Sequence, residues 1–299
     1  MAKRRKFLAW WWQILKQTTS EWLSDDAPQL GAALAYYSVF SLAPLTLLLL
    51  ALVGFIYRAD PEGAWSKLTE QMSYFLDKSA LAVVQEIARK SAEPGKTAFA
   101  TIMGIALALF GASGVFGQLQ NALNTIWGVR AKPGLNIWSF LRARFLSFAM
   151  VLGVCFLLLV SLVLESALKV FSQQVQATLP GGIALALIVY WVFDLAFVIL
   201  LFAAIFKYLP DVKIRWRDVW IGALGTAILF ALGKWALGFY LASGSAASVY
   251  GPASSLITLL LWFYYSSQIL VFGAEFTQVY AQRAGRGVQP SEFAVKKRD

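Results

Sequence analysis

The 299-residue sequence contains no histidine and a single cysteine, Cys155. The lack of histidine excludes catalytic triads that use imidazole and metal sites built on histidine. One cysteine excludes an intramolecular disulfide, CxxC redox chemistry and a cysteine-rich zinc site. The usual serine, thiol and zinc mechanisms therefore lack residues that they require. We expect neither a catalytic residue nor a bound metal or cofactor.

Charged residues are also scarce. They make up 14% of the chain, against 59% hydrophobic residues, whereas ordinary globular domains have about a quarter charged residues. The mean hydropathy is +0.63. This composition has too little polar material to cover a soluble core, so it indicates a membrane protein with several spans.

Long apolar stretches give the number of spans. A membrane helix needs about 20 mostly apolar residues, and six stretches qualify. They are residues 30–57, 98–127, 145–164, 183–206, 219–241 and 253–280. We therefore predict an all-α polytopic membrane protein with six transmembrane helices in a membrane domain of residues 30–280.

The net charge of +10, from 26 basic and 16 acidic residues, is unevenly distributed. Most Lys and Arg residues lie before the first span, after the second and fourth spans, and after the sixth. Basic flanks favour the cytoplasmic side, so both termini are predicted to be cytoplasmic. Because topology alone explains the charge, we expect no nucleic-acid partner.

The N-terminal segment 1–29 has the pattern of an interfacial helix. Large apolar residues, among them Trp11, Trp12 and Leu15, recur at helical spacing. Such a helix places its aromatic face in the headgroup region and its basic residues against anionic lipid. Alternatively, the basic residues only orient the first span. The predicted lipid contacts here are Lys3, Arg4, Arg5 and Lys6.

Two other segments lie outside the spans. The loop 58–97 is too long for a simple connection, and its apolar stripes predict two amphipathic helices that lie on the outer face or fold over the bundle. The segment 281–299 has glycine and proline among its charges. It is predicted to be a mobile, basic cytoplasmic tail.

Charged side chains within spans are costly and usually face protein or water. At about 1.5 Å per residue, Asp194 lies roughly 18 Å from the inner end of its span and Lys234 roughly 22 Å from the inner end of the next. These similar depths suggest a buried pair or one polar cavity. Alternatively, the pair only fixes helix contacts, or Lys234 extends to the outer interface.

Two further candidates for a cavity are Glu275 and Tyr36. Glu275 lies about one turn from the inner end of the sixth span, where it is predicted either to salt-bridge a cytoplasmic Lys or Arg or to contact a substrate. Tyr36 lies beside Tyr37 in the first span, upstream of Pro44. A proline inside a membrane helix frees a carbonyl and permits a kink.

The second span has an amide-lined inner half. Gln118, Asn121 and Thr125 follow one another at helical spacing on one face. That face either hydrogen-bonds neighbouring helices or lines a vestibule open to the cytoplasm. Basic residues beside it suggest a collar for acidic lipid headgroups, although topology alone also predicts them. They are Arg130, Lys132, Arg142 and Arg144.

Several short motifs together resemble the YihY/BrkB family of bacterial inner-membrane proteins. They are Gly-Ala-Ala-Leu-Ala-Tyr-Tyr-Ser at 31–38, Ser-Leu-Ala-Pro-Leu at 41–45, Tyr-Leu-Pro-Asp at 208–211, Arg-Asp at 217–218, Gly-Ala at 222–223, Val-Tyr-Gly at 249–251, Leu-Trp at 261–262 and Gly-Ala-Glu at 273–275. The family often has Phe where Ala43 stands and Ala where Pro252 stands.

The resemblance implies a six-helix protein of the bacterial inner membrane whose activity is unsettled. Members of the family have been linked to envelope properties, proposed as transporters, including of lipids, and labelled ribonuclease BN. This chain has neither histidine nor an acidic metal cluster, so we do not expect ribonuclease activity. The family provides no catalytic residues to carry across.

We therefore predict a transporter or flippase-like carrier of a lipidic or anionic envelope compound, with membrane lipids as partners. A non-transporting scaffold for envelope assembly is the alternative, and a lipid-modifying enzyme is a third reading. A cavity that reaches the middle of the membrane favours transport, whereas a solid bundle with a broad apolar groove favours the scaffold. The sequence carries no signal for the oligomeric state.

Overall fold

The computed structural model describes residues 2–56, 66, 69, 114–132, 182–242, 254–284, 289–292 and 294–297. These residues are mainly helical. The helices are α1 (Ala2–Ser24), α2 (Ala27–Ile56), α7 (Gly182–Tyr208), α8 (Trp216–Ala242) and α10 (Ser254–Arg283). Residues 114–126 are also helical, and we call them the 114–126 helix. The strands are β1 (Val129–Ala131), β2 (Val212–Lys213), β3 (Gln289–Pro290) and β4 (Ala294–Lys296).

Three of the described helices are long and apolar enough to cross a membrane. The segments that qualify are Trp191–Tyr208 in α7, Trp216–Ala236 in α8 and Leu259–Arg283 in α10, which match the last three predicted spans. The 30-residue α2 covers the first predicted span. The 114–126 helix covers the end of the second.

The third predicted span, 145–164, lies outside the described residues. So does the loop 58–97, except for residues 66 and 69. The structure thus confirms a helical membrane protein with three candidate spans, and the total of six stays a prediction.

The boundary between α1 and α2 lies at Asp25 and Asp26. Asp26 has a φ of 53°, in the left-handed region that Asp tolerates better than most residues. The amides of Gln29 and Leu30 donate to the Asp26 carbonyl at 2.9 and 3.2 Å. Pro28 lies in the first turn of α2, where its missing N–H costs nothing. The N-terminal segment is therefore a separate helix that turns sharply away from α2.

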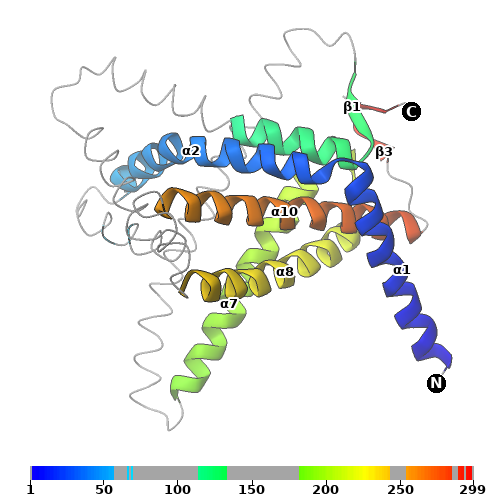
Figure 1. Ribbon diagram of the computed structural model, residues 1–299, viewed down its shortest axis with the longest axis horizontal. Coiled ribbons are helices and arrows are strands. Elements are labelled where there is room, and N and C mark those ends of the chain that lie inside the picture. Colours follow the sequence, from blue (N-terminus) through cyan, green and yellow to red (C-terminus); the bar gives the residue numbers. More distant parts are fainter. Residues whose placement is uncertain are drawn as a thin grey trace.

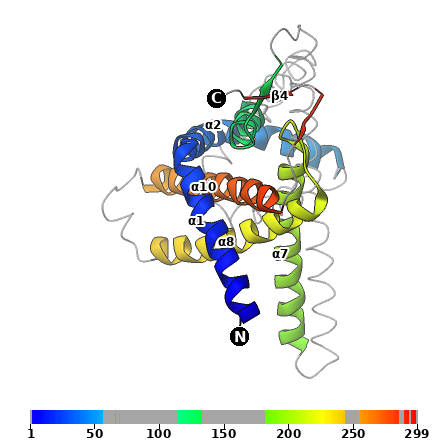
Figure 2. The ribbon, with the colours of Figure 1, turned by 90° about the vertical axis from the view of Figure 1, so that its right-hand side faces the viewer.

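Helix α10 occupies the centre of the arrangement. It lies between α2 and α8 in both views, with α1 crossing its C-terminal part (Figures 1 and 2). Helix α7 crosses α8 close to the loop that joins them, and the other half of α7 extends away from the bundle (Figures 1 and 2). α10 is thus the element against which most of the other described helices are positioned.

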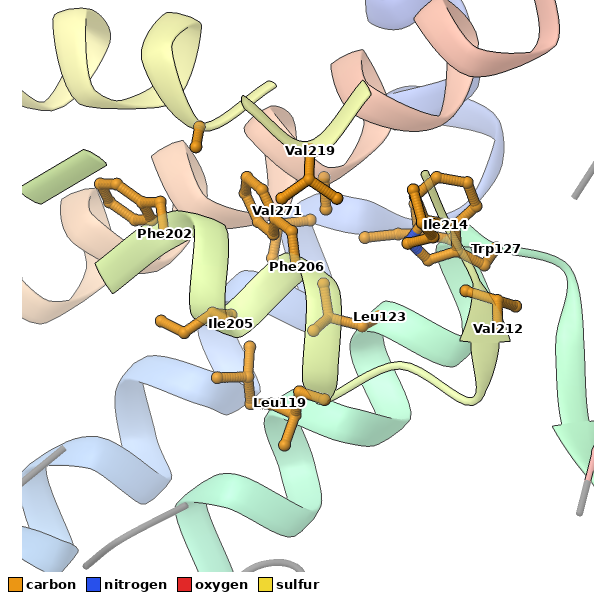
Figure 3. Close-up of a cluster of buried hydrophobic side chains, with 14 of the residues drawn as sticks. Leu119, Leu123, Trp127, Phe202, Ile205, Phe206, Val212, Ile214, Val219 and Val271 are labelled. Carbon is orange, nitrogen blue, oxygen red and sulfur yellow. The ribbon is translucent and has the colours of Figure 1, made fainter. Parts of the chain in front are cut away.

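The larger of the two described apolar clusters lies where α7, α8, α10 and the 114–126 helix meet (Figure 3). Phe206 of α7 is fully buried there, together with Leu123, Val219 and Val271. Trp127 covers one side of this cluster. The core joins α7, α8 and the 114–126 helix to α10 close to the loop between α7 and α8.

Four short strands correct the all-α prediction. β1 pairs with β4, and β2 pairs with β3, both antiparallel. The strands of the tail thus pair with the segment after the 114–126 helix and with the loop between α7 and α8. The prediction of a mobile tail is wrong for its described strand residues, because their backbone groups are hydrogen-bonded to these two segments. Three of the predicted basic segments therefore meet at one end of the molecule (Figure 1).

Candidate functional site

Glycine and threonine interlock α8 with α10. A Cβ atom on Gly222 would lie 1.9 Å from Thr277 Oγ1, and one on Gly273 would lie 2.0 Å from Thr226 Oγ1. Each threonine hydroxyl donates to the glycine carbonyl four residues before it, at 2.7 Å for Thr226 and 2.6 Å for Thr277. Small residues let membrane helices approach closely. This contact is closed and leaves no room for a ligand.

The contact between α2 and α10 is closed at one end and open at the other. A Cβ atom on Gly31 would lie 2.5 Å from Nε2 of Gln268, which donates to the Pro28 carbonyl at 3.0 Å. Toward the start of α10, the same two helices border an apolar groove of about 360 Å³. It is lined by Ala32, Ala35, Tyr36, Ile257, Leu260, Leu261 and Tyr264.

This groove contains the predicted candidate Tyr36, whose side chain is 59% exposed. The groove volume falls within the range of about 300–1,000 Å³ typical of small-molecule sites. Its lining is apolar, unlike the polar cavity that the sequence suggested. The groove therefore suits an apolar chain better than a polar solute.

Aromatic rings attach α1 to α10. Trp11 stacks on Phe276 and Tyr280, with ring centroids 6.2 and 6.1 Å apart. The other side of α1 is apolar as well, since Trp12 is 69% exposed and Leu23 is 60% exposed. Helix α1 thus has one apolar face against the bundle and a second facing outward, and its place at a membrane interface stays a prediction.

Glu275 is fully buried, with an exposed fraction of 0%. Neither of its carboxyl oxygens has a hydrogen-bond partner. The charges that act on it within the described part of the chain are those of Asp25 and Glu21, from the C-terminal end of α1 and the turn that follows. The basic partner that the sequence suggested is thus replaced by two acidic groups. An unpaired carboxylate in such a place costs several kcal/mol.

The basic residue closest to the end of α10 is engaged elsewhere. Arg283 donates to Gln17 Oε1 at 2.5 Å and to Gln13 Oε1 at 3.0 Å. Nε2 of Gln17 then donates to Glu21 Oε1 at 2.6 Å. Arg283 is therefore linked through an amide to Glu21 at the surface of α1.

Burial raises the pKa of Asp25 above its ordinary value of 3.8. The negative charge of Glu21 raises this pKa further, whereas Lys297 of the tail lowers it and Asp26 raises it. The folded protein thus keeps a proton on Asp25 to a higher pH than the unfolded chain does. Folding and proton binding are linked at this residue.

The pH dependence of stability should reveal this linkage. Because the folded state binds the extra proton, the free energy of unfolding should fall as the pH rises from about 4 through the folded pKa of Asp25. In Asp25→Asn this dependence should become flatter, and in Lys297→Gln it should become steeper. Thermal unfolding of the three proteins between about pH 4 and pH 7 measures it. Identical slopes in all three would contradict the assignment.

Asp194 and Lys234 are both half-buried, on α7 and α8 respectively. No hydrogen bond or ion pair joins them to each other in the described parts of these helices. The physical reason is that α7 crosses α8 near their loop and then extends away (Figure 2). Equal depth along two crossing helices does not bring side chains together, so a direct pair has no support here.

The polar side chains predicted to line one face of the second span do not form a common polar surface. Asn121 is exposed, while Gln118 and Thr125 are half-buried. The Thr125 hydroxyl donates to the backbone carbonyl of Asn121 at 3.0 Å, one turn earlier. Within the described residues these three side chains do not meet in a cavity.

The amides that make tertiary contacts are the neighbours Gln120 and Asn124. Nδ2 of Asn124 donates to Asp211 Oδ2 at 2.9 Å, and the Asp211 amide donates back to Asn124 Oδ1 at 2.8 Å. Nε2 of Gln120 reaches the same carboxylate oxygen at 3.3 Å. The Ser291 amide donates to the Asp211 carbonyl at 2.8 Å. These four residues form what we call the Asp211 junction.

Sequence reasoning did not single out this junction. The available signal was weak: two amides at i and i+4 on one helix, and an aspartate after Pro210 in one of the family motifs. Nothing in the sequence paired the two segments. The junction joins the 114–126 helix, the loop between α7 and α8, and the tail.

The predicted lipid-contact residues are only partly described. Arg130 and Lys132 are exposed, and the Lys132 ammonium donates to the Glu292 carbonyl in the tail. Arg142 and Arg144 lie outside the described residues. So do the side chains of positions 3–6 in α1. Among the described segments, no three His, Cys, Asp or Glu residues are grouped so as to hold a metal ion.

Comparison with known proteins shows the family. The sequence model of a family described as "Virulence factor BrkB" matches residues 18–297. A "UPF0761 membrane protein" of Tolumonas auensis is 27% identical over 96% of this chain and 91% of its own length. Proteins of that name from Delftia acidovorans and Stenotrophomonas maltophilia are 32% and 28% identical, over 71% and 87% of this chain.

The chain spans 48% of the Delftia relative and 58% of the Stenotrophomonas relative, so these proteins are longer. No solved structure matches this chain.

Proposed function

Since this chain belongs to the BrkB family of membrane proteins, we propose that it acts as a transporter or flippase-like carrier of a lipidic or anionic envelope compound. The observation that carries this proposal is the apolar groove between α2 and α10. It has the size of a small-molecule site and an apolar lining, and its aromatic wall is exposed. An acyl chain is the ligand that such a surface accepts most readily.

The opposite end of α10 supports an anionic ligand. The groove lies at the start of α10, while the basic tail strands pair with the neighbouring segments beyond its end. Anionic headgroups are attracted to clusters of Lys and Arg near a membrane surface. The groove suits the apolar chain of an amphiphile and the basic end suits its acidic head, at opposite ends of α10.

We further propose that this basic end faces the cytoplasm of a bacterium, in the inner membrane. Basic segments near span ends are retained on the cytoplasmic side. Here the segment after the 114–126 helix, the loop between α7 and α8, and the tail are hydrogen-bonded to one another. A single orientation therefore accounts for all three.

Filling the groove should slow lipid movement. Ala32 lines the groove and is exposed, so Ala32→Trp occupies the groove without disturbing buried packing. In proteoliposomes that contain fluorescently labelled phosphatidylglycerol, we expect the label to reach a membrane-impermeant quencher about tenfold more slowly, as for a loss of about 1.4 kcal/mol of binding free energy. Ala236→Trp, on the exposed side of α8, is the matched control and should keep the wild-type rate.

Wild-type protein that moves the label no faster than protein-free vesicles would contradict the proposal. Bound phosphatidylglycerol without movement would instead favour the scaffold. That alternative is supported by the outward apolar face of α1, with Trp12 and Leu23, which offers a surface for partners or for the lipid interface.

A further inference from the structure

Buried polar atoms without partners gather along α10 where it meets α1. Both carboxyl oxygens of Glu275, Oε1 of Gln278 on α10 and Oγ1 of Thr18 on α1 have no hydrogen-bond partner. Thr18 and Glu275 are 0% exposed, and Gln278 is 9% exposed. Buried polar groups are normally satisfied, so a fully buried carboxyl among other unpaired polar atoms is an unfavourable environment for an ionised group.

Helix packing places Thr18 level with Glu275. Where α1 crosses α10, Trp11 stacks on Phe276 and Tyr280, whereas Trp22 meets Phe272 at a ring-centroid distance of 6.3 Å, so later residues of α1 contact earlier residues of α10. Thr18 is one turn before Trp22 and Glu275 is about one turn after Phe272. The unpaired hydroxyl and the unpaired carboxyl therefore lie at the same level of the α1–α10 contact.

The groups that act on Glu275 lie in α1 and in the turn that follows it. Glu21 and Asp25 act on Glu275 electrostatically, and both are half-buried, whereas Glu275 is fully buried. Lys297 from the tail acts on Asp25. From the described parts of α2 and α8, no charged group acts on Glu275. Glu21 and Asp25 are thus more accessible to solvent than Glu275 and are electrostatically coupled to it.

Most of the unpaired polar atoms at this contact are acceptors, and Nε1 of Trp22 on α1 is an unpaired donor there. The unpaired atoms of Glu275 and Gln278 are acceptors only, and the hydroxyl of Thr18 can act in either role. One proton on Glu275 converts an acceptor into a donor and removes the buried charge. A metal ion fits less well, because the described residues hold no group of three ligands for it.

We propose that Glu275 is a proton-binding site, reached from solvent through Glu21 and Asp25. On uptake, an O–H bond in water breaks as one forms on a half-buried carboxylate. The proton then passes to Glu275, so the net charge of the three carboxylates becomes less negative by one. The proton-binding site itself does not depend on the proposed function. Only its role does: in a carrier, a proton bound beside α10 would couple transport to a pH gradient.

Infrared spectroscopy of the full chain in lipid nanodiscs, without substrate, tests the site directly. In the wild type, the C=O stretch of a protonated carboxylic acid should disappear as the pH is raised from about 5 to about 9. Glu275→Gln should lose most of this band, and the carboxyl of Asp25, whose pKa burial raises, accounts for the remainder. Glu292→Gln, at an exposed carboxylate in the tail, is the control and should keep it. In Asp25→Asn the band should disappear at a lower pH, because a negative neighbour has been removed.

A wild type without the band, or a band as strong in Glu275→Gln as in the wild type, would overturn the proposal. If Glu275→Gln does not yield folded protein, the shift in Asp25→Asn decides, and an unshifted band counts against the proposed entry path. Because this readout needs no transported lipid, its failure leaves the lipid-movement assay unaffected. Conversely, if the band titrates in protein that moves no lipid, the proton-binding site would be supported and the carrier function would be contradicted.

Discussion

Gly222→Val should destabilise the protein by about 3 kcal/mol, at the upper end of the usual range for overpacking. A Cβ atom at this position would lie 1.9 Å from Thr277 Oγ1 and 2.8 Å from Thr277 Cβ. Threonine is β-branched and has few alternative rotamers in a helix. Its hydroxyl is also bound to Gly273, so the side chain cannot move aside without losing that hydrogen bond. Helices α8 and α10 would have to separate.

Thermal or denaturant unfolding in one detergent measures this effect, and two controls identify its cause. Gly222→Val combined with Thr277→Gly removes the blocking side chain and should recover most of the lost stability, as coupled residues do in a double-mutant cycle. Gly117→Ala meets nothing within 4 Å. It should be neutral or stabilising by up to about 1 kcal/mol. Wild-type stability of Gly222→Val would show that α8 and α10 do not pack in this register.

Helix positions were well predicted, because membrane thickness imposes a strong length signal on apolar segments. The predicted spans 183–206, 219–241 and 253–280 became Gly182–Tyr208, Trp216–Ala242 and Ser254–Arg283. Each end differs by at most three residues. The start of α2 was also close, because Pro28 limits where a helix can begin.

The rotation of each helix about its axis was harder to predict. A stripe of small residues in α8, including Ala223, Ala227 and Ala231, suggests one face toward the bundle. The structure buries Ala223 and Ala227 but leaves Ala231 exposed. The face that locks to α10 is instead the one with Gly222 and Thr226. A glycine that makes room for a side chain of another helix can be recognised only once that side chain is known. Here the side chain is a threonine on a different helix.

The neighbourhood of Glu275 could not be predicted from local pattern. The sequence places this residue near the basic end of its span, where a salt bridge is the ordinary outcome. The left-handed turn at Asp26 directs α1 back across α10, so Glu21 and Asp25 arrive there instead. The direction of that turn depends on one backbone angle, which no periodicity of the sequence encodes.

The paired tail was missed for a related reason. Strands of two or three residues are too short to show an alternating pattern. Glycine and proline within the tail are typical of an unpaired segment, and the strands that pair with it lie far away in sequence. Prediction was therefore strongest for the position of a single helix, which its own composition determines. It was weakest for contacts between segments that are far apart in the sequence.

Asp211→Ala should lower the free energy of unfolding by about 2 to 3 kcal/mol, because hydrogen bonds to a charged group contribute about 1.5–3 kcal/mol. The carboxylate accepts from Asn124 and Gln120 at 2.9 and 3.3 Å. Its removal leaves both amides without this acceptor next to the apolar core that contains Leu123 and Phe206. The loss should appear as easier separation of the 114–126 helix from the loop between α7 and α8.

Hydrogen exchange in the tail measures this separation. The Ser291 amide is bound to the carbonyl of Asp211, so loosening the loop should raise hydrogen exchange in residues 289–292 by about tenfold, as for about 1.4 kcal/mol of local opening. Asp211→Asn keeps one acceptor oxygen and should show a smaller increase. Glu292→Ala, with an exposed side chain on the same segment, should leave exchange at Ser291 unchanged. Equal exchange in Asp211→Ala and wild type would mean that the tail strands hold their position without the Asp211 junction. In that case, β2 pairing with β3 would suffice to attach the tail.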